Sequence, residues 1–152
     1  MAAGGCYAAA VRLLARREHS RAELERKLGR AHEAEEIAAA LDRLAAERLQ
    51  SDRRFAAEFI VAKMAGWGRR RLLAELRERG VAAEIAAEEI EAGLKEGEQQ
   101  RAEAALRRKY GGRLGADERA TGQALRFLAQ RGFDGASAAK ALAACRREAA
   151  GR

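Results

Sequence analysis

Side chains that could act as nucleophiles, general bases or metal ligands are scarce in this sequence of 152 residues. The two histidines and two cysteines lack the spacing of a zinc site; they are His19, His32, Cys6 and Cys145. The Gly-Trp-Gly run at residues 66–68 follows a predicted helix, whereas a nucleotide-binding fingerprint follows a strand. We therefore expect no catalytic residue, no metal site and no cofactor, and a protein that is not an enzyme.

Basic side chains are the abundant chemical group. Lys and Arg together number 30, against 23 Asp and Glu, which gives a formal net charge of +7. Residues 98–152 carry 12 basic and 6 acidic side chains, whereas residues 7–51 and 52–97 are close to neutral. Because guanidinium groups bind carboxylates and phosphates, this local excess indicates an anionic partner.

The first candidate binding set follows Gly68. Its first three arginines open a predicted helix, where they oppose the helix dipole at a cost of roughly a few tenths of a kcal/mol each. This arrangement indicates a negatively charged partner; the alternative is a solvated helix start in an arginine-rich chain. The set consists of Arg69, Arg70, Arg71, Arg77 and Arg79.

The second candidate set supplies much of the basic excess of residues 98–152. Cations interleaved with a tyrosine could follow a phosphate backbone, although a solvated helix face is the alternative interpretation. The set consists of Arg107, Arg108, Lys109, Tyr110, Arg113, Arg126 and Arg131, and Arg146 and Arg147 add to the same excess.

Trp67 and Cys145 each have two interpretations. An aromatic ring beside arginines could stack on a nucleic acid base, but a lone tryptophan also fills gaps between packed helices. Cys145 lies on a predicted alanine-rich helix, where we expect a small buried side chain. We expect both cysteines to be free thiols.

The elements that must position these side chains are helices. Ala, Leu, Glu, Arg and Lys make up 104 residues, proline is absent, and Val and Ile total seven, too few for a sheet. Leu, Ile, Val and Phe reach only about 18%, a fraction that indicates disorder when net charge is high. Because opposite charges here alternate at helical spacing, we predict instead an all-α fold with small cores.

Capping residues and glycines divide the chain into nine predicted helices. Ser20 and Glu23 form a capping box, and Ser51-Asp52 and Asp134 start two further helices. The predicted helices are 7–18, 20–30, 34–48, 52–65, 69–79, 82–94, 98–110, 117–131 and 134–148.

Two predicted helices end at an Arg-Gly-apolar sequence. Gly80 and Gly132 should adopt the left-handed conformation there, with Val81 and Phe133 folding back onto the helix. The corresponding stop in the first third of the chain is missing near His32.

A repeated spacing groups these helices in threes. Leu24, Leu28 and Ile37 are separated by four and nine residues, and the same intervals recur from Leu72, with a weaker third copy from Ala124. We predict tandem three-helix repeats in an elongated, curved arrangement. Their predicted bounds are 1–51, 52–97 and 98–152.

Blocks of this sequence resemble the bacterial RecX family of regulatory proteins, over about residues 10–95. They are LLARREHSRAELERKL at 13–28, LQSDRRFA at 49–56 and GRRRLLAELRERGV at 68–81, with a weaker FLAQRGF at 127–133. Two features depart from the family. Gly68-Arg69 replaces the usual Gly-Pro, and the stop after the second helix of the first repeat is replaced near His32.

The resemblance implies tandem three-helix repeats and a function. RecX proteins bind the RecA recombinase filament on DNA, lie in its groove, and restrain its ATPase, strand-exchange and cleavage-promoting activities. We therefore expect the first set to contact the filament, and the second to contact the filament or single- or double-stranded DNA. A competing hypothesis is a free-standing helical nucleic-acid-binding module, and a third is a structural scaffold.

The lengths of the apolar runs indicate the cellular compartment of the protein. No run approaches 18 apolar residues and none is typical of a secretory signal. We expect a cytoplasmic protein without a membrane partner, monomeric when free.

Overall fold

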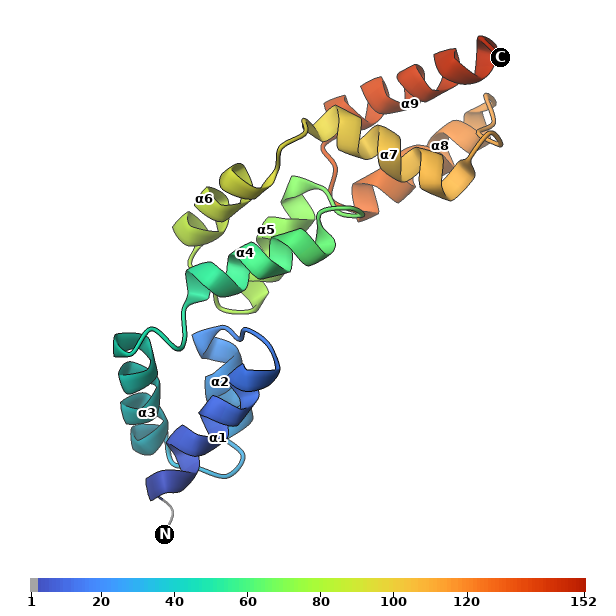
Figure 1. The fold of residues 1–152 in the computed structure, drawn as a ribbon. Helices are drawn as coiled ribbons and strands as arrows, with labels where there is room; N and C mark the ends of the chain where they lie inside the picture. The colour runs from blue at the N-terminus through green and yellow to red at the C-terminus, as the bar shows by residue number, and fades with distance from the viewer. Residues whose placement is uncertain (1–2) are drawn as a thin grey trace. The chain divides into compact units, whose positions relative to one another are not determined.

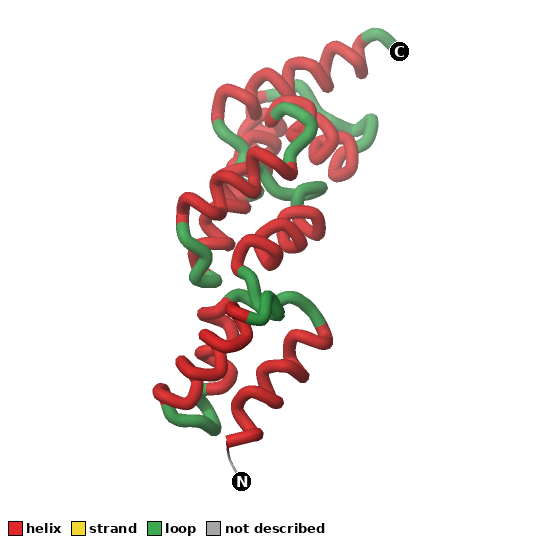
Figure 2. The backbone as a smooth tube through the Cα atoms, turned by 60° about the vertical axis from the view of Figure 1, so that its left-hand side comes forward, coloured by secondary structure: helices red, strands yellow, loops and turns green. Residues whose placement is uncertain are grey.

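The computed structural model describes residues 3–152, which form nine α-helices and no β-strand (Figures 1 and 2). The predicted all-α class is confirmed, and the predicted bounds differ from the observed ones by a few residues, most at the start of α1. The helices are α1 (Ala3–Arg16), α2 (Arg21–Leu28), α3 (Ala34–Ala46), α4 (Asp52–Lys63), α5 (Arg69–Glu78), α6 (Ala83–Gly93), α7 (Glu98–Tyr110), α8 (Glu118–Gln130) and α9 (Gly135–Ala150).

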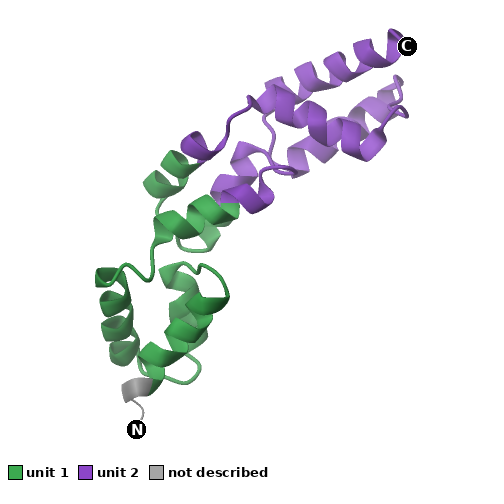
Figure 3. Cartoon of the chain, in the orientation of Figure 1, with its two compact units in different colours: residues 1–59, 75–89 green, residues 60–74, 90–152 purple. Residues whose placement is uncertain are grey.

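The helices form two compact units (Figure 3). One consists of residues 1–59 and 75–89, and the other of residues 60–74 and 90–152. In the first unit α1, α2 and α3 pack against one another, and in the second α7, α8 and α9 do so. Since the division passes through α4, α5 and α6, the three predicted domain boundaries stay a prediction.

The core of the first unit lies between α1, α2 and α3. Each of these helices has 14 residues or fewer and would be marginal alone, so burial of its apolar face stabilises it. Each fully buried leucine contributes about 1.5–3 kcal/mol. The core members are Cys6, Ala10, Leu24, Leu28, Ile37, Ala40, Leu41 and Leu44.

The core of the second unit is formed by α7, α8, α9 and the turn before α9. Half of its members are alanines, so it is built largely from short side chains. Cys145 is 8% exposed, which confirms its predicted burial, and neither cysteine forms a disulfide. The core members are Ala102, Ala105, Leu106, Ala124, Leu128, Phe133, Ala138, Ala141, Leu142 and Cys145.

Both predicted glycine stops are confirmed. Gly80 and Gly132 have φ angles of 84° and 88°, in the left-handed region. The amides of Val81 and Phe133 each donate to a carbonyl five residues back at 3.0 Å, and both side chains are buried. Each stop therefore turns the chain sharply while its apolar residue returns to the core.

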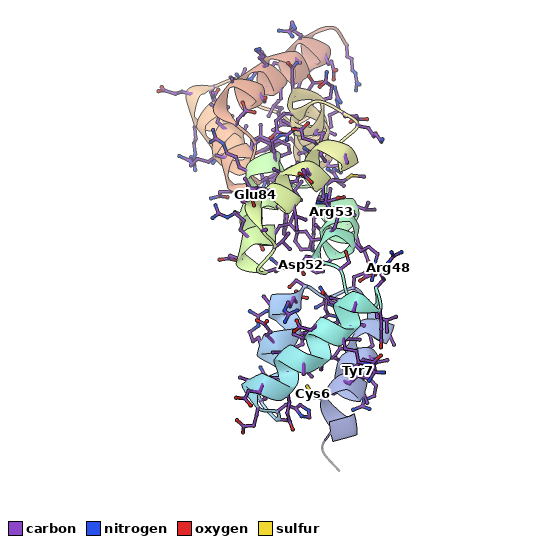
Figure 4. The ribbon with its side chains drawn as sticks, turned by 90° about the vertical axis from the view of Figure 1, so that its left-hand side faces the viewer. Cys6, Tyr7, Arg48, Asp52, Arg53 and Glu84 are labelled. Carbon is purple, nitrogen blue, oxygen red and sulfur yellow. The ribbon has the colours of Figure 1, made fainter. Side chains whose placement is uncertain are left out.

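A third left-handed stop ends α3 without a glycine. Arg48 has a φ of 60°, and the amide of Leu49 donates to the carbonyl of Leu44 at 2.9 Å. A left-handed arginine costs about 1–2 kcal/mol relative to the right-handed conformation. Figure 4 shows Arg48 and Asp52 at the connection between α3 and α4.

Hydrogen bonds of Asp52 join the connection between α3 and α4 to the start of α2 within the first unit. The carboxylate of Asp52 accepts from the amide of Arg21 at 2.8 Å and from the side chain of Gln50 at 2.9 Å. The hydroxyl of Ser51, not Asp52, caps α4 by accepting from the amide of Arg54 at 3.2 Å. Asp52 thus joins two segments rather than capping its own helix.

Candidate anion-binding sites

The amino end of α5 meets the carboxyl end of α8 in the second unit. The amide of Gly68 donates to the carbonyl of Arg131 at 2.6 Å, and the amide of Arg70 donates to the carbonyl of Gly132 at 3.1 Å. A Cβ on Gly68 would overlap the backbone of residue 132, and a Cβ on Gly132 would overlap Arg71. The carbonyls of the two residues that follow α8 therefore satisfy amides that would otherwise need a cap or an external anion.

Two arginines of the first set are held by groups of the chain itself. Arg69 forms an ion pair with Glu91, and its amide donates to the carboxylate of Glu98 at 3.2 Å. The guanidinium of Arg71 lies 4.1 Å from the centre of the Trp67 ring. Internal carboxylates thus supply at least part of the negative charge that the sequence indicated for this helix start.

Arg79 has an internal role in the first unit. Its guanidinium donates to the carboxylate of Glu75 at 2.6 Å and lies 4.7 Å from the centre of the Phe59 ring. It also approaches the buried carboxylate of Glu23 at 4.0 Å. These contacts position Arg79 in the packing of the unit.

Arg70 and Arg77 are exposed, like Arg69, but they differ from it in their contacts. Within residues 3–152 no hydrogen bond or ion pair engages either side chain. Both guanidinium groups can therefore bind an external anion without breaking a hydrogen bond or an ion pair, although the charge of Arg70 also acts on the Asp134 carboxylate.

The Trp67 ring is half-buried and covered by cations. In addition to Arg71, the ammonium of Lys63 lies 5.2 Å from its centre. Arg71 also donates to the carbonyl of Gln130 at 3.4 Å, so the ring and both cations pack at the junction with α8. This arrangement favours the packing interpretation of Trp67 over base stacking.

Arg101 is a buried cation that the sequence reasoning did not single out. It is 7% exposed, donates to the carbonyl of Met64 at 2.9 Å and to that of Trp67, and pairs with Glu98 at 3.2 Å. Burial lowers the pKa of Arg101, which stays charged at neutral pH. The sequence does contain a signal for this burial: Arg101 lies four residues before Ala105 and therefore on the same, buried face of α7.

Arg107 in the second set ties α7 to α9. It pairs with Glu103 at 3.1 Å and with Glu148 at 2.6 Å. The hydrogen bond from Arg107 lowers the pKa of Glu148, because it stabilises the ionised carboxylate. Because two internal carboxylates neutralise its charge, the Arg107 guanidinium attracts an external anion only weakly.

Two other cations of the second set lie against one aromatic ring. The ammonium of Lys109 is 4.6 Å from the centre of the Phe127 ring, and the guanidinium of Arg131 is 5.2 Å from it. Such contacts contribute about 0.5–1 kcal/mol each at exposed sites. Tyr110 packs edge-on against the same ring at 6.2 Å between ring centres.

These cations border an open pocket of about 370 Å³ in the second unit. We call it the Phe127 pocket; its lining residues are Gly66, Ala105, Arg108, Lys109, Phe127 and Arg131. None of the six is acidic. The sequence predicted all three cations but not Phe127, which lies four residues before Arg131 and so on the same helical face.

The remaining second-set residues lie outside this pocket. Arg113 follows α7 and Arg126 lies on α8, and both are exposed. No hydrogen bond or ion pair engages either side chain in the described part of the chain.

Residues 3–152 offer neither a cluster of metal ligands nor a helix suited to a bilayer. This range contains no group of three His, Cys, Asp or Glu side chains that could hold a metal ion. None of its helices combines the length and apolar character needed to cross a bilayer.

Family comparisons match most of the chain to one group. Residues 6–44 match the family model "RecX, first three-helix domain", and residues 51–89 match "RecX, second three-helix domain". These matches confirm the predicted tandem three-helix repeats over both ranges.

Individual relatives agree with this match. "Regulatory protein RecX" of Chromohalobacter salexigens is 43% identical over 127 residues, covering 82% of each chain. The protein of the same name from Chromobacterium violaceum is 44% identical over 128 residues, covering 83% of this chain and 81% of its own. The crystal structure of RecX from Lactobacillus salivarius superposes with a TM-score of 0.79 at 18% identity, covering 95% of this chain and 97% of that one.

Proposed function

Because the chain belongs to the RecX family of regulatory proteins, we propose that it binds the RecA recombinase filament on DNA and restrains the filament's ATPase, strand-exchange and coprotease activities. The family match carries this proposal. The role requires no catalysis by the chain itself, and it places the protein in the cytoplasm as a monomer that assembles on its target.

The exposed cations of α5 support a filament contact. Arg70 and Arg77 are free to meet carboxylates on a partner, whereas Arg69, Arg71 and Arg79 position the helix and its surroundings. Since a filament repeats the same surface, several weak contacts made by one chain reinforce one another through effective concentration. Binding to one filament state then shifts the filament toward that state.

The direct test measures RecA ATPase on single-stranded DNA with the purified protein added. We expect lower turnover and co-sedimentation with filaments. The double variant Arg70→Glu/Arg77→Glu should need at least about tenfold more protein for the same inhibition, because charge reversal replaces attraction with repulsion. Arg26→Glu reverses an exposed cation of α2 and serves as the matched control.

Two results would contradict the proposal. Unchanged turnover together with no co-sedimentation would remove the RecA role. Full inhibition by the double variant would remove Arg70 and Arg77 from the contact and leave the family role in place.

The basic excess of residues 98–152 favours a second candidate, a free-standing nucleic-acid-binding module. Direct readout of base pairs relies on Asn, Gln or Arg at exposed positions, and this chain has no Asn. A salt titration of DNA binding without RecA separates the two. Tight, sequence-dependent binding supports the module, and weak, steeply salt-sensitive binding supports the regulator.

A further inference from the structure

The Phe127 pocket holds its cations in place without neutralising them. The ring contacts of Lys109 and Arg131 restrict both side chains, yet a ring supplies no negative charge. Arg108 adds a third cation to the same lining, and the small residues Gly66 and Ala105 leave the space between them open. Three like charges bordering one space repel one another until an anion enters it.

Arg107 provides the contrast one position away. Its guanidinium is engaged by Glu103 and Glu148, whereas the side chains of Arg108 and Lys109 form no ion pair within residues 3–152. The helix thus places one cation against internal carboxylates, whereas the two cations that follow it lie in the lining of the pocket. The positive charge at the pocket therefore arises from the way the fold pairs Arg107 and leaves Arg108 and Lys109 without an ion pair among the described residues, and not only from the number of basic residues in the sequence.

The backbone around the pocket is already ordered. The carbonyl of Arg131 is bound by the amide of Gly68, and the edge-on contact with Tyr110 fixes the Phe127 ring. A ligand entering the pocket consequently has little protein to immobilise, which lowers the entropic cost of binding.

We propose that the Phe127 pocket binds a phosphate group of a nucleic acid backbone, with Arg108, Lys109 and Arg131 as its ligands. The two unesterified oxygens of a phosphodiester can accept from several cations at once. The exposed Arg113 and Arg126 lie in the same unit and add to its positive charge outside the pocket. The choice of nucleic acid as the source of the phosphate rests on the proposed function.

The pocket fits a nucleic acid better than an acidic protein surface. A protein interface needs an apolar centre, and the exposed large apolar side chains among the described residues are Val11, Leu49 and Val61. None of them lines the pocket. Cations that border an open space with little exposed apolar area match the phosphate contacts of DNA-binding proteins.

The test uses fluorescence anisotropy of a labelled oligothymidylate with the full chain in the absence of RecA. Lys109→Ala and Arg131→Ala should each weaken binding by about threefold to tenfold. Each should also reduce the magnitude of the slope of log K against log salt by about 0.7, which is the value for one lost phosphate contact on a single strand. Arg107→Ala also removes one cation and should leave affinity and slope close to those of the parent. Circular dichroism checks that each variant is folded.

Two further arms identify the ligand. Phe127→Leu keeps every charge and should weaken binding by a few-fold, because the cations lose the surface that orients them. ATP and inorganic phosphate, as free sources of phosphate, should compete only at concentrations far above that of the oligonucleotide. Equal competition by either would overturn the nucleic acid assignment, and equally tight binding of polyglutamate with the same variant dependence would overturn phosphate itself.

The RecA assay separates this inference from the proposed function. Equal losses for Arg107→Ala and Lys109→Ala would overturn the pocket, whatever the effect on RecA. If the parent protein leaves RecA ATPase unchanged while oligothymidylate binding depends on Lys109 and Arg131, the proposed function fails and the phosphate pocket stands.

Discussion

The hydroxyl of Ser20 donates a hydrogen bond to the carbonyl of Arg79 at 2.5 Å, although 59 residues separate them. The same oxygen accepts from the amide of Glu23 at 3.1 Å, and the carboxylate of Glu23 accepts from the amide of Ser20 at 3.4 Å. One buried side chain therefore both caps α2 and fixes it against the end of α5. Local and long-range order in the first unit depend on the same oxygen.

Ser20→Ala should lower the free energy of unfolding by about 2–3 kcal/mol. The loss combines a helix cap with a carbonyl at residue 79 that is left unsatisfied. Urea denaturation followed by circular dichroism measures it. Ser51→Ala is the matched control: it removes a cap without a long-range bond and should cost about 1 kcal/mol. Equal losses would show that the bond to Arg79 contributes nothing.

Gly132→Ala should cost about 3 kcal/mol, because it adds left-handed strain and a clash with Arg71. Gly111→Ala tests backbone strain without a clash: its φ of 58° and ψ of −128° form a conformation that favours glycine and an added Cβ would meet open space, so we expect a loss of about 1–3 kcal/mol. Gly135→Ala has neither problem and should be neutral or slightly stabilising. Thermal denaturation of the three variants measures the losses; a loss at residue 132 as small as that at residue 135 would exclude both the strain and the clash at Gly132.

Arg101→Met should destabilise the protein by about 3 kcal/mol, because two carbonyls lose their charged donor. Arg101→Lys should recover only part of this loss, since an ammonium lacks the fork that reaches both oxygens. Arg119→Ala removes an exposed cation of α8 and should have little effect. Full recovery by lysine in urea denaturation would show that charge alone matters.

Stability should fall as the pH drops below about 6.5, because of His19. Burial is the main cause that lowers the His19 pKa from its ordinary 6.5; Arg17 and Lys27 act in the same direction by charge, and Glu23 and the hydrogen bond to the Arg17 carbonyl oppose it. With the folded pKa below the unfolded value, the unfolded chain binds more protons between the two. The stability contribution is therefore complete above pH 6.5 and declines toward the folded pKa.

Histidine ring NMR and urea denaturation at several pH values check this prediction. His19→Gln should reduce the dependence of unfolding free energy on pH between about 7 and 5. A His19 ring that titrates at 6.5 or above would contradict it.

The fold could be predicted largely because its start and stop signals are local. The capping bonds of Ser20 and Asp134 and the turns at Gly80 and Gly132 join residues no more than five apart, and each forms as its sequence context indicates. The left-handed Arg48 could not be foreseen, since no glycine marks it and other contacts must offset its strain.

The candidate sites were less predictable because ion pairing joins distant residues. The sequence showed arginines at positions 69 and 107, but not that Arg69 meets Glu91 or that Arg107 meets Glu148 across 41 residues. The burial of Arg101 likewise depends on the carbonyls of Met64 and Trp67, which follow α4 and lie 37 and 34 residues away. Local spacing shows where cations gather, and the tertiary fold decides which of them are neutralised.

The bonds that join residues 68–70 to the end of α8 also impose an order on folding. Helices α7, α8 and α9 follow one another along the chain, and the contact between Arg107 and Glu148 closes a loop of 41 residues, whereas Arg71 and Gln130 are 59 residues apart. Longer loops cost more entropy and close more slowly. The three helices can therefore assemble while residues 60–74 are still undocked, and the amides of Gly68 and Arg70 become protected from hydrogen exchange last in the second unit.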